Sequence, residues 1–191
     1  MPSTSRFLTA LRRVVRSVSG SGRRPAPVRE TAATRGGRAE VSARRVSAGE
    51  LSPGQAGEAA TLELDPHRIG RVRFAYAPEH DGQPDPGEIV WTWVPYEEHD
   101  GRGKDRPVAI VAAGAPGDFL AVQLTSKGRD GDRDYLGLGA GDWDASGRPS
   151  WARIDRVFRV RTGGMRREGA SLDAERFARL TAALEARYGW R

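Results

Sequence analysis

Residues 87–114 read GEIVWTWVPYEEHDGRGKDRPVAIVAAG, and this stretch decides the fold. Two runs with β-branched and aromatic side chains, residues 88–95 and residues 104–114, flank a polar loop that contains two glycines. Runs of this kind, bounded by turn residues, are typical of β-strands. The sequence therefore predicts two strands joined by the loop at residues 96–103.

The chain beyond this stretch continues in short runs of the same kind. Residues 119–126 (FLAVQLTS) form a third run, residues 134–140 (DYLGLGA) a weaker fourth, and residues 150–160 (SWARIDRVFRV) a fifth. Glycine and proline lie between the runs, without a helical crossover. Strands at this spacing predict a compact antiparallel barrel or a strongly bent sheet, and they disfavour a parallel α/β fold.

The end of the chain carries a helical pattern instead. Four apolar side chains recur at helical spacing and share one face: Phe177, Leu180, Leu184 and Tyr188. Ser171 is the expected N-cap, acidic residues follow in the first turn, and Gly189 is the expected stop. The sequence predicts a terminal helix between these two residues.

The amino-terminal third differs in charge and composition. Residues 1–50 hold 11 arginines and 3 glutamates, which leaves 20 basic and 22 acidic residues for the remainder, so the net charge of +6 belongs to this tail. Residues 19–66 have few large apolar side chains and are expected to form a disordered linker. We interpret residues 1–66 as a basic, largely disordered extension, residues 67–83 as a connecting segment, and residues 84–191 as the folded domain.

Two segments before the folded domain have patterns of their own. Residues 5–18 predict a short basic amphipathic helix, and a terminal helix that forms weakly is favoured over a membrane-surface, partner-docking or RNA-binding arm. Arginines interrupt its apolar positions, so it does not fit a signal peptide, and a cytoplasmic location is expected. Residues 69–78 alternate apolar and polar side chains and predict an extra strand or a docking segment.

Composition also limits the chemistry that the chain can perform. It has no cysteine, which excludes disulfides, thiolate metal sites and cysteine nucleophiles. His67, His80 and His99 lie in polar settings without the spacing of metal ligands. We therefore expect neither a metal nor another cofactor.

The order of the runs resembles the PemK/MazF toxins over about residues 84–191. GEIVWTWVPY, KDRPVAIVA, FLAVQLTS and SWARIDRV follow one another before a terminal helix. The most telling features are an Arg-Pro pair at the start of the second strand and a Thr-Ser pair at the end of the third. The resemblance implies an SH3-like barrel of the CcdB/MazF type with added helices, usually a homodimer. It also implies a sequence-specific, metal-independent endoribonuclease that cuts single-stranded RNA and is inhibited by a cognate antitoxin.

The resemblance also assigns functional residues. The family's catalytic arginine falls on Arg106 and its hydroxyl partner on Thr125, with Ser126 as a substitute. The nucleophile is the 2′-hydroxyl of the substrate, so the protein must stabilise charge on the phosphorane, and a guanidinium stays charged and offers paired donors to phosphate oxygens. The residues expected to contact RNA are Glu88, Trp93, Lys104 and Lys127.

Simpler interpretations remain open for these residues and for the domain. Arg106 can be an edge-strand arginine paired with Asp105 or Glu88, and tryptophans two apart, such as Trp91 and Trp93, more often belong to a core or interface than to a base-stacking platform. The same barrel type serves CcdB-like gyrase-binding toxins and binding modules. A catalytically inactive barrel that binds nucleic acid or protein is therefore the alternative function.

Overall fold

The strands of the domain were defined in a computed structural model that describes residues 51–79 and 81–190. In chain order the elements are β1 (Leu62–Leu64), the 3-10 helix η1 (Pro66–Arg68), β2 (Glu88–Pro95), β3 (Gly103–Ala113), β4 (Asp118–Thr125), β5 (Tyr135–Gly139), β6 (Ser150–Arg153), β7 (Val157–Arg161), the 3-10 helix η2 (Thr162–Gly164), β8 (Arg166–Ser171) and α1 (Ala174–Tyr188). The helix expected over residues 5–18, and the rest of the extension before residue 51, lie outside the described residues.

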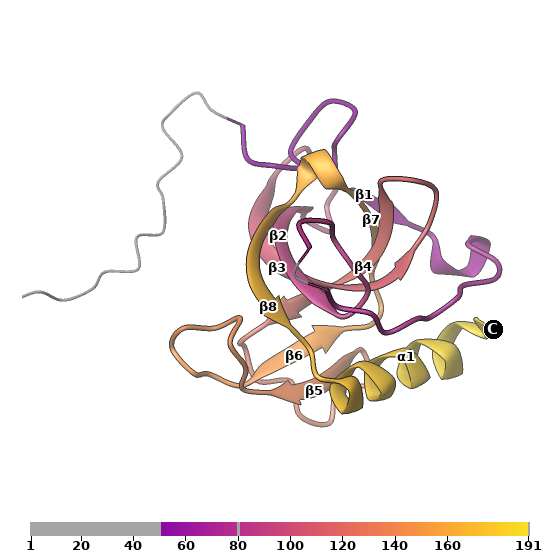
Figure 1. The fold of residues 1–191 in the computed structure, drawn as a ribbon, viewed down its shortest axis with the longest axis vertical. Coiled ribbons are helices and arrows are strands. Elements are labelled where there is room, and N and C mark those ends of the chain that lie inside the picture. Colours follow the sequence, from indigo (N-terminus) through magenta and orange to yellow (C-terminus); the bar gives the residue numbers. More distant parts are fainter. Residues whose placement is uncertain (1–50, 80, 191) are drawn as a thin grey trace, which may run out of the picture. The chain divides into compact units, whose positions relative to one another are not determined.

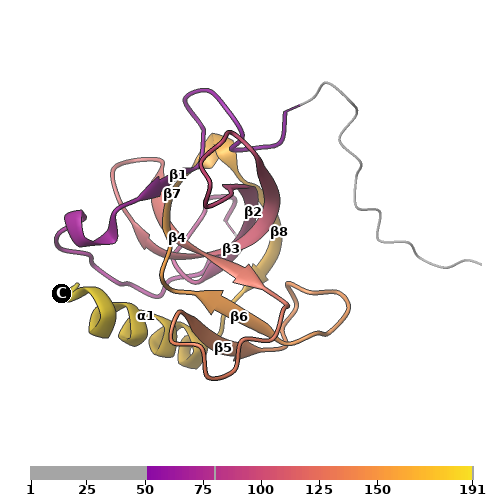
Figure 2. The same ribbon diagram turned by 180° about the vertical axis from the view of Figure 1, so that it is seen from behind.

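The eight described strands form one antiparallel sheet that curves strongly (Figure 1). The strand order is β1-β7-β4-β3-β2-β8, and β6 pairs with both β4 and β5. β4 is the hub, because it pairs with β3, β7 and, at its carboxyl end, β6. Figure 2 shows the same curvature from behind. The expected mainly β fold is confirmed, but no pairing joins β1 to β8 among the described strands, so the barrel stays open.

The deciding stretch folds as its pattern predicts. β2 and β3 pair in a continuous register from Ile89 opposite Ala109 to Pro95 opposite Gly103. The polar loop between them contains His99 at φ 49°, in the left-handed region. The third and fourth runs form β4 and β5, with bounds within one residue of the predicted ones.

The fifth predicted strand was wrong as a single element. It consists of β6 and β7, separated by a turn at Ile154 and Asp155. The Ile154 N–H donates to the carbonyl of Asp134, 2.8 Å away, and this bond belongs to neither of the flanking ladders. β8, with the polar sequence RREGAS, carries no apolar alternation and was not predicted from sequence.

The sheet buries apolar side chains on both of its faces, because neighbouring residues of a strand point to opposite faces. One cluster lies among strands alone and consists of Val90, Val94, Val108, Ile110, Phe119, Ala121, Phe158 and Val160. The other includes Ile89, Val111, Val122 and Leu124 from the opposite face, together with residues of α1 and β5. The helix therefore covers one face, while the strand-only cluster fills the space that the curved strands enclose.

Helix α1 is held at both ends by local capping. Asp173 is the N-cap, and its carboxylate accepts a hydrogen bond of 2.7 Å from the Arg176 N–H, whereas Ser171, the expected cap, is the last residue of β8. Gly189 ends the helix at φ 70° with its N–H bonded to the carbonyl of Glu185, which confirms the predicted stop. Among the described residues, no helix is long and apolar enough to cross a membrane.

The residues just before the folded domain are part of the sheet, which corrects the interpretation of residues 51–66 as disordered linker. β1 pairs with β7. Upstream of β1, the Pro53 carbonyl accepts a hydrogen bond of 2.9 Å from the Trp93 N–H. Gly54, at φ 79°, lies so close to Thr92 that a Cβ there would be 2.3 Å from its hydroxyl. The composition of this segment does not favour order, and long-range contacts with β2 and β7 supply the stabilisation instead.

The connecting segment packs on the sheet without forming a strand between residues 69 and 79. Val72 is buried, and the Tyr76 hydroxyl donates to the Leu172 carbonyl at 2.9 Å. Tyr76 also contacts the Phe177 ring of α1, with ring centroids 5.3 Å apart. The extra strand, one of the two sequence-based alternatives, is therefore absent from the described part of this segment, which packs against the sheet and α1 instead.

Candidate active site

Arg106 lies near the start of β3, opposite Thr92 of β2. Pro107 follows it, and a residue before proline is restricted to extended backbone, which suits a strand. On the other side of β3, the ladder with β4 ends at Val108 opposite Gln123. Continued by two residues, this register sets Arg106 opposite Thr125, on the face of the sheet that carries Val108. The topology therefore brings the two principal sequence-predicted catalytic residues to neighbouring strands.

A pocket of about 420 Å³ opens beside Arg106. Along β3, Arg106 comes just before Val108 and Ile110 of the strand-only apolar cluster. Its lining residues are Pro95, Tyr96, Glu97, Glu98, Arg102, Arg106, Gln123, Arg153 and Arg156. They come from the loop between β2 and β3, from the two central strands, and from the region of the β6–β7 turn. Four arginines in one pocket make it suited to an anion such as a phosphate.

Arg106 makes no ion pair or side-chain hydrogen bond with any residue that the structure describes. The two carboxylates considered as its partners from sequence each bond to another arginine, although Oδ1 of Asp105 is buried without a partner among the described residues. Asp105 accepts a bond of 3.0 Å from Arg166, and the buried Glu88 accepts one of 2.6 Å from Arg167. The ion-pair interpretation of Arg106 is thus wrong for the residues that the structure describes.

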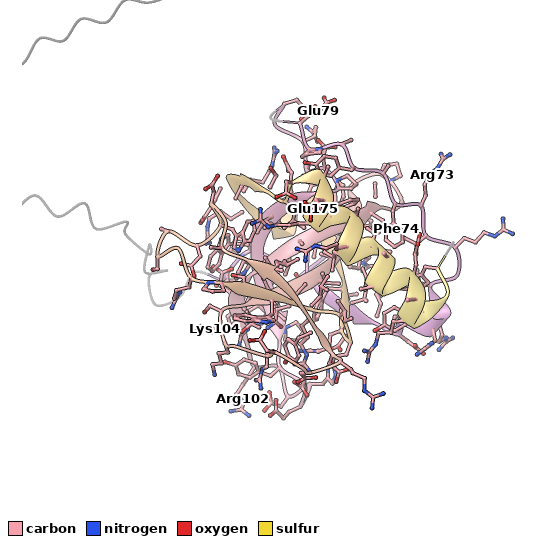
Figure 3. All side chains as sticks on the ribbon, turned by 90° about the horizontal axis from the view of Figure 1, so that it is seen from below. Arg73, Phe74, Glu79, Arg102, Lys104 and Glu175 are labelled. Carbon is pink, nitrogen blue, oxygen red and sulfur yellow. The ribbon has the colours of Figure 1, made fainter. Side chains whose placement is uncertain are left out.

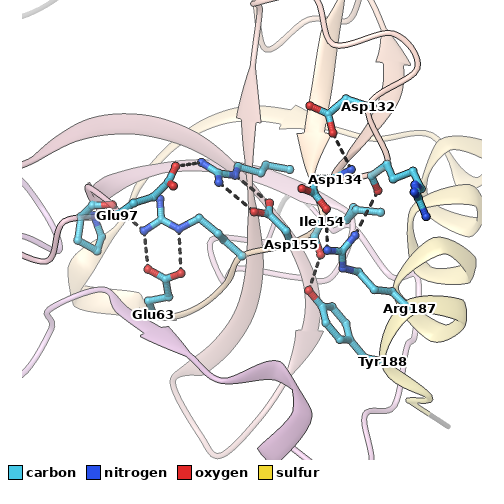
Figure 4. A network of polar contacts seen from close by, with 12 residues as sticks. Glu63, Glu97, Asp132, Asp134, Ile154, Asp155, Arg187 and Tyr188 are labelled. Atoms are coloured by element: carbon cyan, nitrogen blue, oxygen red, sulfur yellow. Dashed lines mark hydrogen bonds and ion pairs between the residues drawn. The ribbon is translucent and has the colours of Figure 1, made fainter.

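Arg153 is held between two carboxylates. Asp155 receives two hydrogen bonds from it, of 2.8 and 2.9 Å, and Glu97 of the β2–β3 loop receives a third (Figure 4). Burial lowers the pKa of the Arg153 guanidinium, but the hydrogen bonds and charges of its partners outweigh burial and raise the pKa above its ordinary value. The hydrogen bond and charge of Arg153 in turn hold the pKa of Glu97 below its usual range. Arg153 therefore ties the loop to the β6–β7 turn.

Arg156 is the most buried arginine of the pocket, with 6% of its surface exposed. Its guanidinium pairs with Glu63 of β1 and donates to the Pro95 carbonyl at 2.9 Å. It also lies over the Phe158 ring, 5.0 Å from the centroid. In Figure 4 the labelled Glu63 and Glu97 belong to neighbouring pairs of one network.

Thr125 ends β4, and its hydroxyl oxygen accepts a hydrogen bond of 3.2 Å from the backbone N–H of Lys127. A hydroxyl that accepts at its oxygen still has its proton to donate, so this structural bond leaves it able to bind a phosphate oxygen. Thr125 also lies opposite Trp151 of β6. Ser126 follows as an exposed residue outside the strand.

The remaining sequence-predicted residues occupy three different places. Lys104 and Lys127 are exposed, and Figure 3 labels Lys104 near Arg102 and apart from helix α1. Trp93 points to the sheet face opposite Val94, and its indole lies close against Gly103. Glu88 lies at the other end of β2 from Pro95, a separation on the order of 20 Å at about 3.3 Å per residue. The structure does not bring Trp93 or Glu88 to the pocket.

Sequence reasoning missed Gln123, Arg153 and Arg156 as pocket residues. For the two arginines the available signal was the run SWARIDRVFRV, in which arginines interrupt an otherwise apolar stretch, whereas Gln123 lies in the run FLAVQLTS and had no such signal. Charged residues placed within a strand pattern need partners when they are buried, so such positions are candidates for a site.

A second hollow lies over the β5–β6 loop and is lined by Ala140, Gly141, Asp142, Asp144, Ala145 and Gly147. Asp144 in this hollow pairs with Arg148 at 2.9 Å. The described residues include no group of three or more acidic or histidine side chains placed to hold a metal ion. The arginine pocket beside β3 is thus the better candidate for binding an anionic substrate.

The fold and pocket define a small, mainly β protein with an open, strongly curved sheet and a pocket lined by four arginines. The profile of a family described as PemK-like, MazF-like toxin of type II toxin-antitoxin system matches residues 85–187. The chain belongs to this toxin family.

The solved structures that resemble the chain include two described as containing MazF and one described as an endoribonuclease. A MazE–MazF complex from Deinococcus radiodurans is 18% identical, with 56% of this chain and 97% of that chain covered and a TM-score of 0.43. An endoribonuclease in complex with its cognate antitoxin from a Mycobacterial species is 17% identical, with 57% and 98% covered and a TM-score of 0.45. The Mycobacterium tuberculosis toxin MazF-mt6 is 16% identical, with 53% and 98% covered and a TM-score of 0.38. No curated protein sequence matches the chain significantly.

Proposed function

We propose that the protein is an endoribonuclease toxin that cleaves single-stranded RNA by attack of the substrate's own 2′-hydroxyl. Membership of a toxin family supports the class of activity. The observation that carries the proposal is an arginine, Arg106, that lines an arginine-rich pocket and has no ion-pair partner among the described residues. A guanidinium kept away from carboxylates at such a position is available for a phosphate.

The reaction needs no covalent intermediate on the protein. The 2′-oxygen forms a bond to the adjacent phosphorus and loses its proton, while the bond from phosphorus to the 5′-oxygen breaks and that oxygen takes up a proton. The products are a 2′,3′-cyclic phosphate and a 5′-hydroxyl end. The protein's contribution is to stabilise the extra negative charge on the phosphorane.

Arg106 is assigned the larger share of this stabilisation. Its planar donors match two non-bridging oxygens, and one well-placed donor of this kind is worth about 3–4 kcal/mol in the transition state. A guanidinium stays charged, so its effect is electrostatic. Thr125 adds a neutral hydrogen bond, and Ser126 is the substitute donor.

The RNA on either side of the scissile phosphate is proposed to contact exposed cations. Lys104 lies at the start of β3, and Lys127 follows the end of β4, so they flank Arg106 and Thr125 along the chain. Each neutralised phosphate contributes to a salt-dependent affinity. Trp93 and Glu88 lie away from the pocket and are left out of the proposed interface.

The family's place in type II toxin-antitoxin systems supports two partners. We extend to this chain a cognate protein antitoxin and a second copy of the toxin. The toxin can be co-expressed with a small acidic protein encoded by a neighbouring gene. Size-exclusion chromatography with light scattering then tests for both partners at once.

Purified protein incubated with single-stranded RNA in the presence of EDTA tests the activity. Fragments with 5′-hydroxyl ends are expected from the natural chain, and Arg106→Ala should abolish them with its melting temperature unchanged. Arg179→Ala, which changes an exposed arginine of α1, is the matched control and should cleave normally. RNA that stays intact with the natural chain, while still binding to it, would favour the non-catalytic binding role.

A further inference from the structure

Strand β1 lies upstream of the residues that the family profile matches, yet its Glu63 pairs with Arg156, which lines the pocket. Glu63 in the middle of β1 lies opposite Phe158 of β7. Its two carboxylate oxygens accept from the Nε and Nη2 atoms of Arg156, the first at 2.8 Å. The two residues are 93 positions apart, so the pair forms only when β1 is on the sheet.

We propose, on the basis of the function proposed above, that Arg156 is a second phosphate-binding cation of the pocket and that Glu63 is the residue that positions it. A guanidinium has five N–H donors. The bonds to Glu63 and to the Pro95 carbonyl use Nε–H and both donors of Nη2. The two donors on Nη1 have no partner among the described residues, and Arg156 lines the pocket. They are available to a phosphate oxygen.

Three contacts fix the orientation of this guanidinium. Glu63 accepts hydrogen bonds from Nε and Nη2 in a bidentate pair, and the Pro95 carbonyl accepts another from Nη2 at 2.9 Å. The Cζ atom lies over the Phe158 ring, 5.0 Å from its centroid. Only 7% of the Arg156 side chain is exposed. A cation this deeply buried is placed by its partners rather than by solvent, because it has few alternative positions in which its charge is compensated.

Glu63 also reaches the loop that borders the pocket. The His99 Nε2 atom lies 3.6 Å from the Glu63 carboxylate, and His99 occupies the left-handed region at φ 49°. One carboxylate thus faces both the buried arginine and the loop between β2 and β3. The other charged side chains of the pocket lining are Glu97, Glu98, Arg102, Arg106 and Arg153.

Two physical effects of Glu63 on RNA binding have opposite signs. As a negative charge near the pocket it repels phosphate, so its removal should strengthen binding if charge alone decides. As a positioning group it keeps Nη1 of Arg156 directed for binding, so its removal should weaken binding. We expect positioning to prevail, because breaking one partner of a buried charge pair leaves the other uncompensated and free to reorient.

The test is a double-mutant cycle with Glu63→Gln, Arg156→Gln and the double variant in the full chain. The readouts are kcat/KM on single-stranded RNA, the Kd for 2′-O-methyl RNA, which cannot be cleaved, and the melting temperature. Glu63→Gln is expected to lower kcat/KM and to raise the Kd by about 30-fold or more, as for truncation of one partner of a buried pair. In the Arg156→Gln background the same change should have no further effect.

Two variants separate positioning from general stability. Glu63→Asp keeps the charge and should recover at least part of the Kd, even if Glu63→Gln proves too unstable to assay. Glu58→Gln removes an exposed carboxylate of the same segment and should change nothing. Tighter binding by Glu63→Gln, or equal losses in both Arg156 backgrounds, would overturn the proposal.

The outcome is separable from that of the proposed function. If the natural chain never cleaves RNA, the proposed function fails, but the cycle on 2′-O-methyl RNA still decides whether Glu63 positions Arg156. If the natural chain cleaves RNA and the cycle shows no coupling, only the positioning proposal fails.

Discussion

The two sides of the arginine pocket differ in how their charges are compensated. On the β3 side, Arg106 has no carboxylate partner among the residues that the structure describes. On the side of the β6–β7 turn, Arg153 is bonded to Asp155 and Glu97, and Arg156 to Glu63. Arg153 and Arg156 thus join separate elements of the fold, and the proposed phosphate binding by Arg156 adds to that structural role. Arg106 makes no such link among the described residues, so only the proposed chemical role is left for it.

This difference has a physical basis. A buried arginine costs free energy unless carboxylates and carbonyls compensate it, so Arg153 and Arg156 bring their own partners. Arg106 is only partly buried, so part of its surface is open to solvent. A cation that is not already neutralised gives more stabilisation to a phosphate that develops charge. The comparison predicts that the two groups respond differently to mutation.

The largest effect is expected from Arg106→Ala. We expect kcat to fall by about 10²- to 10³-fold, as on removal of one oxyanion donor, with the melting temperature within error of the natural chain. Single-turnover cleavage and thermal melting check the two halves of this expectation. A variant that melts early would place Arg106 with the structural arginines.

Arg153→Ala should affect stability more than cleavage, which is the reverse of the expectation for Arg106→Ala. Its loss leaves Asp155 without its two hydrogen bonds, and we expect the free energy of unfolding to fall by about 2 kcal/mol, in the range for bonds to charged groups. Urea unfolding followed by tryptophan fluorescence measures this change. Unaltered stability together with lost cleavage would remove the distinction between the two sides of the pocket.

A smaller effect is expected from Thr125→Val, which removes the hydroxyl but keeps the shape. One neutral hydrogen bond in the transition state is worth about 1 kcal/mol, so cleavage should slow by about 3- to 10-fold. Thr125→Ser should restore most of the rate, because it restores the donor. If valine and serine behave alike, the hydroxyl has no part in the reaction.

The smallest effect is expected from Glu97→Gln, which removes a negative charge from the pocket. RNA affinity should rise by about two- to fivefold at neutral pH, since a repulsion of this kind near a surface is worth about 1 kcal/mol or less. Glu98→Gln is the matched control, because it removes an equal charge from the same pocket lining. The two glutamates differ in that Glu97 accepts a hydrogen bond from Arg153 and Glu98 does not.

The same pair predicts a pH dependence. The pKa of Glu97 lies below its ordinary value, so the pair with Arg153 is complete above that ordinary value and is lost only as pH falls through the lowered one. The natural chain and Glu97→Gln should therefore differ in RNA affinity near neutral pH and converge in acid. Kd measurements across this range, at constant salt, check the direction; a gap that widens in acid would contradict it.

The sequence predicted the parts of the fold whose signals are local. β2 to β5 combine β-rich runs with glycine- or proline-containing turns, and their positions were right. β1 is only three residues long and is stabilised by β7, so its own composition does not reveal it. The cap of α1 was misplaced because Ser171 and Asp173 are both good N-cap residues, and the end of β8 decides between them.

The features of the site likewise divide into those that could be predicted from the sequence and those that could not. Arg106 was assigned through its family resemblance, but which carboxylate pairs with which arginine depends on chain segments far apart. Glu63 and Arg156 meet only after the sheet has formed, and no spacing rule connects them. That Glu88 and Asp105 are taken by Arg167 and Arg166 is likewise a property of the β2–β8 pairing and of the sheet around it.

The position of β1 at the outer side of β7 has a consequence for solubility. An uncovered strand edge presents unpaired amide and carbonyl groups, which invite another chain to add to the sheet. β1 occupies this edge along Val157–Arg159 with only three residues. A chain trimmed to the family-matched residues would bare that edge and become prone to aggregate, so the short strand acts as a shield for the toxin domain.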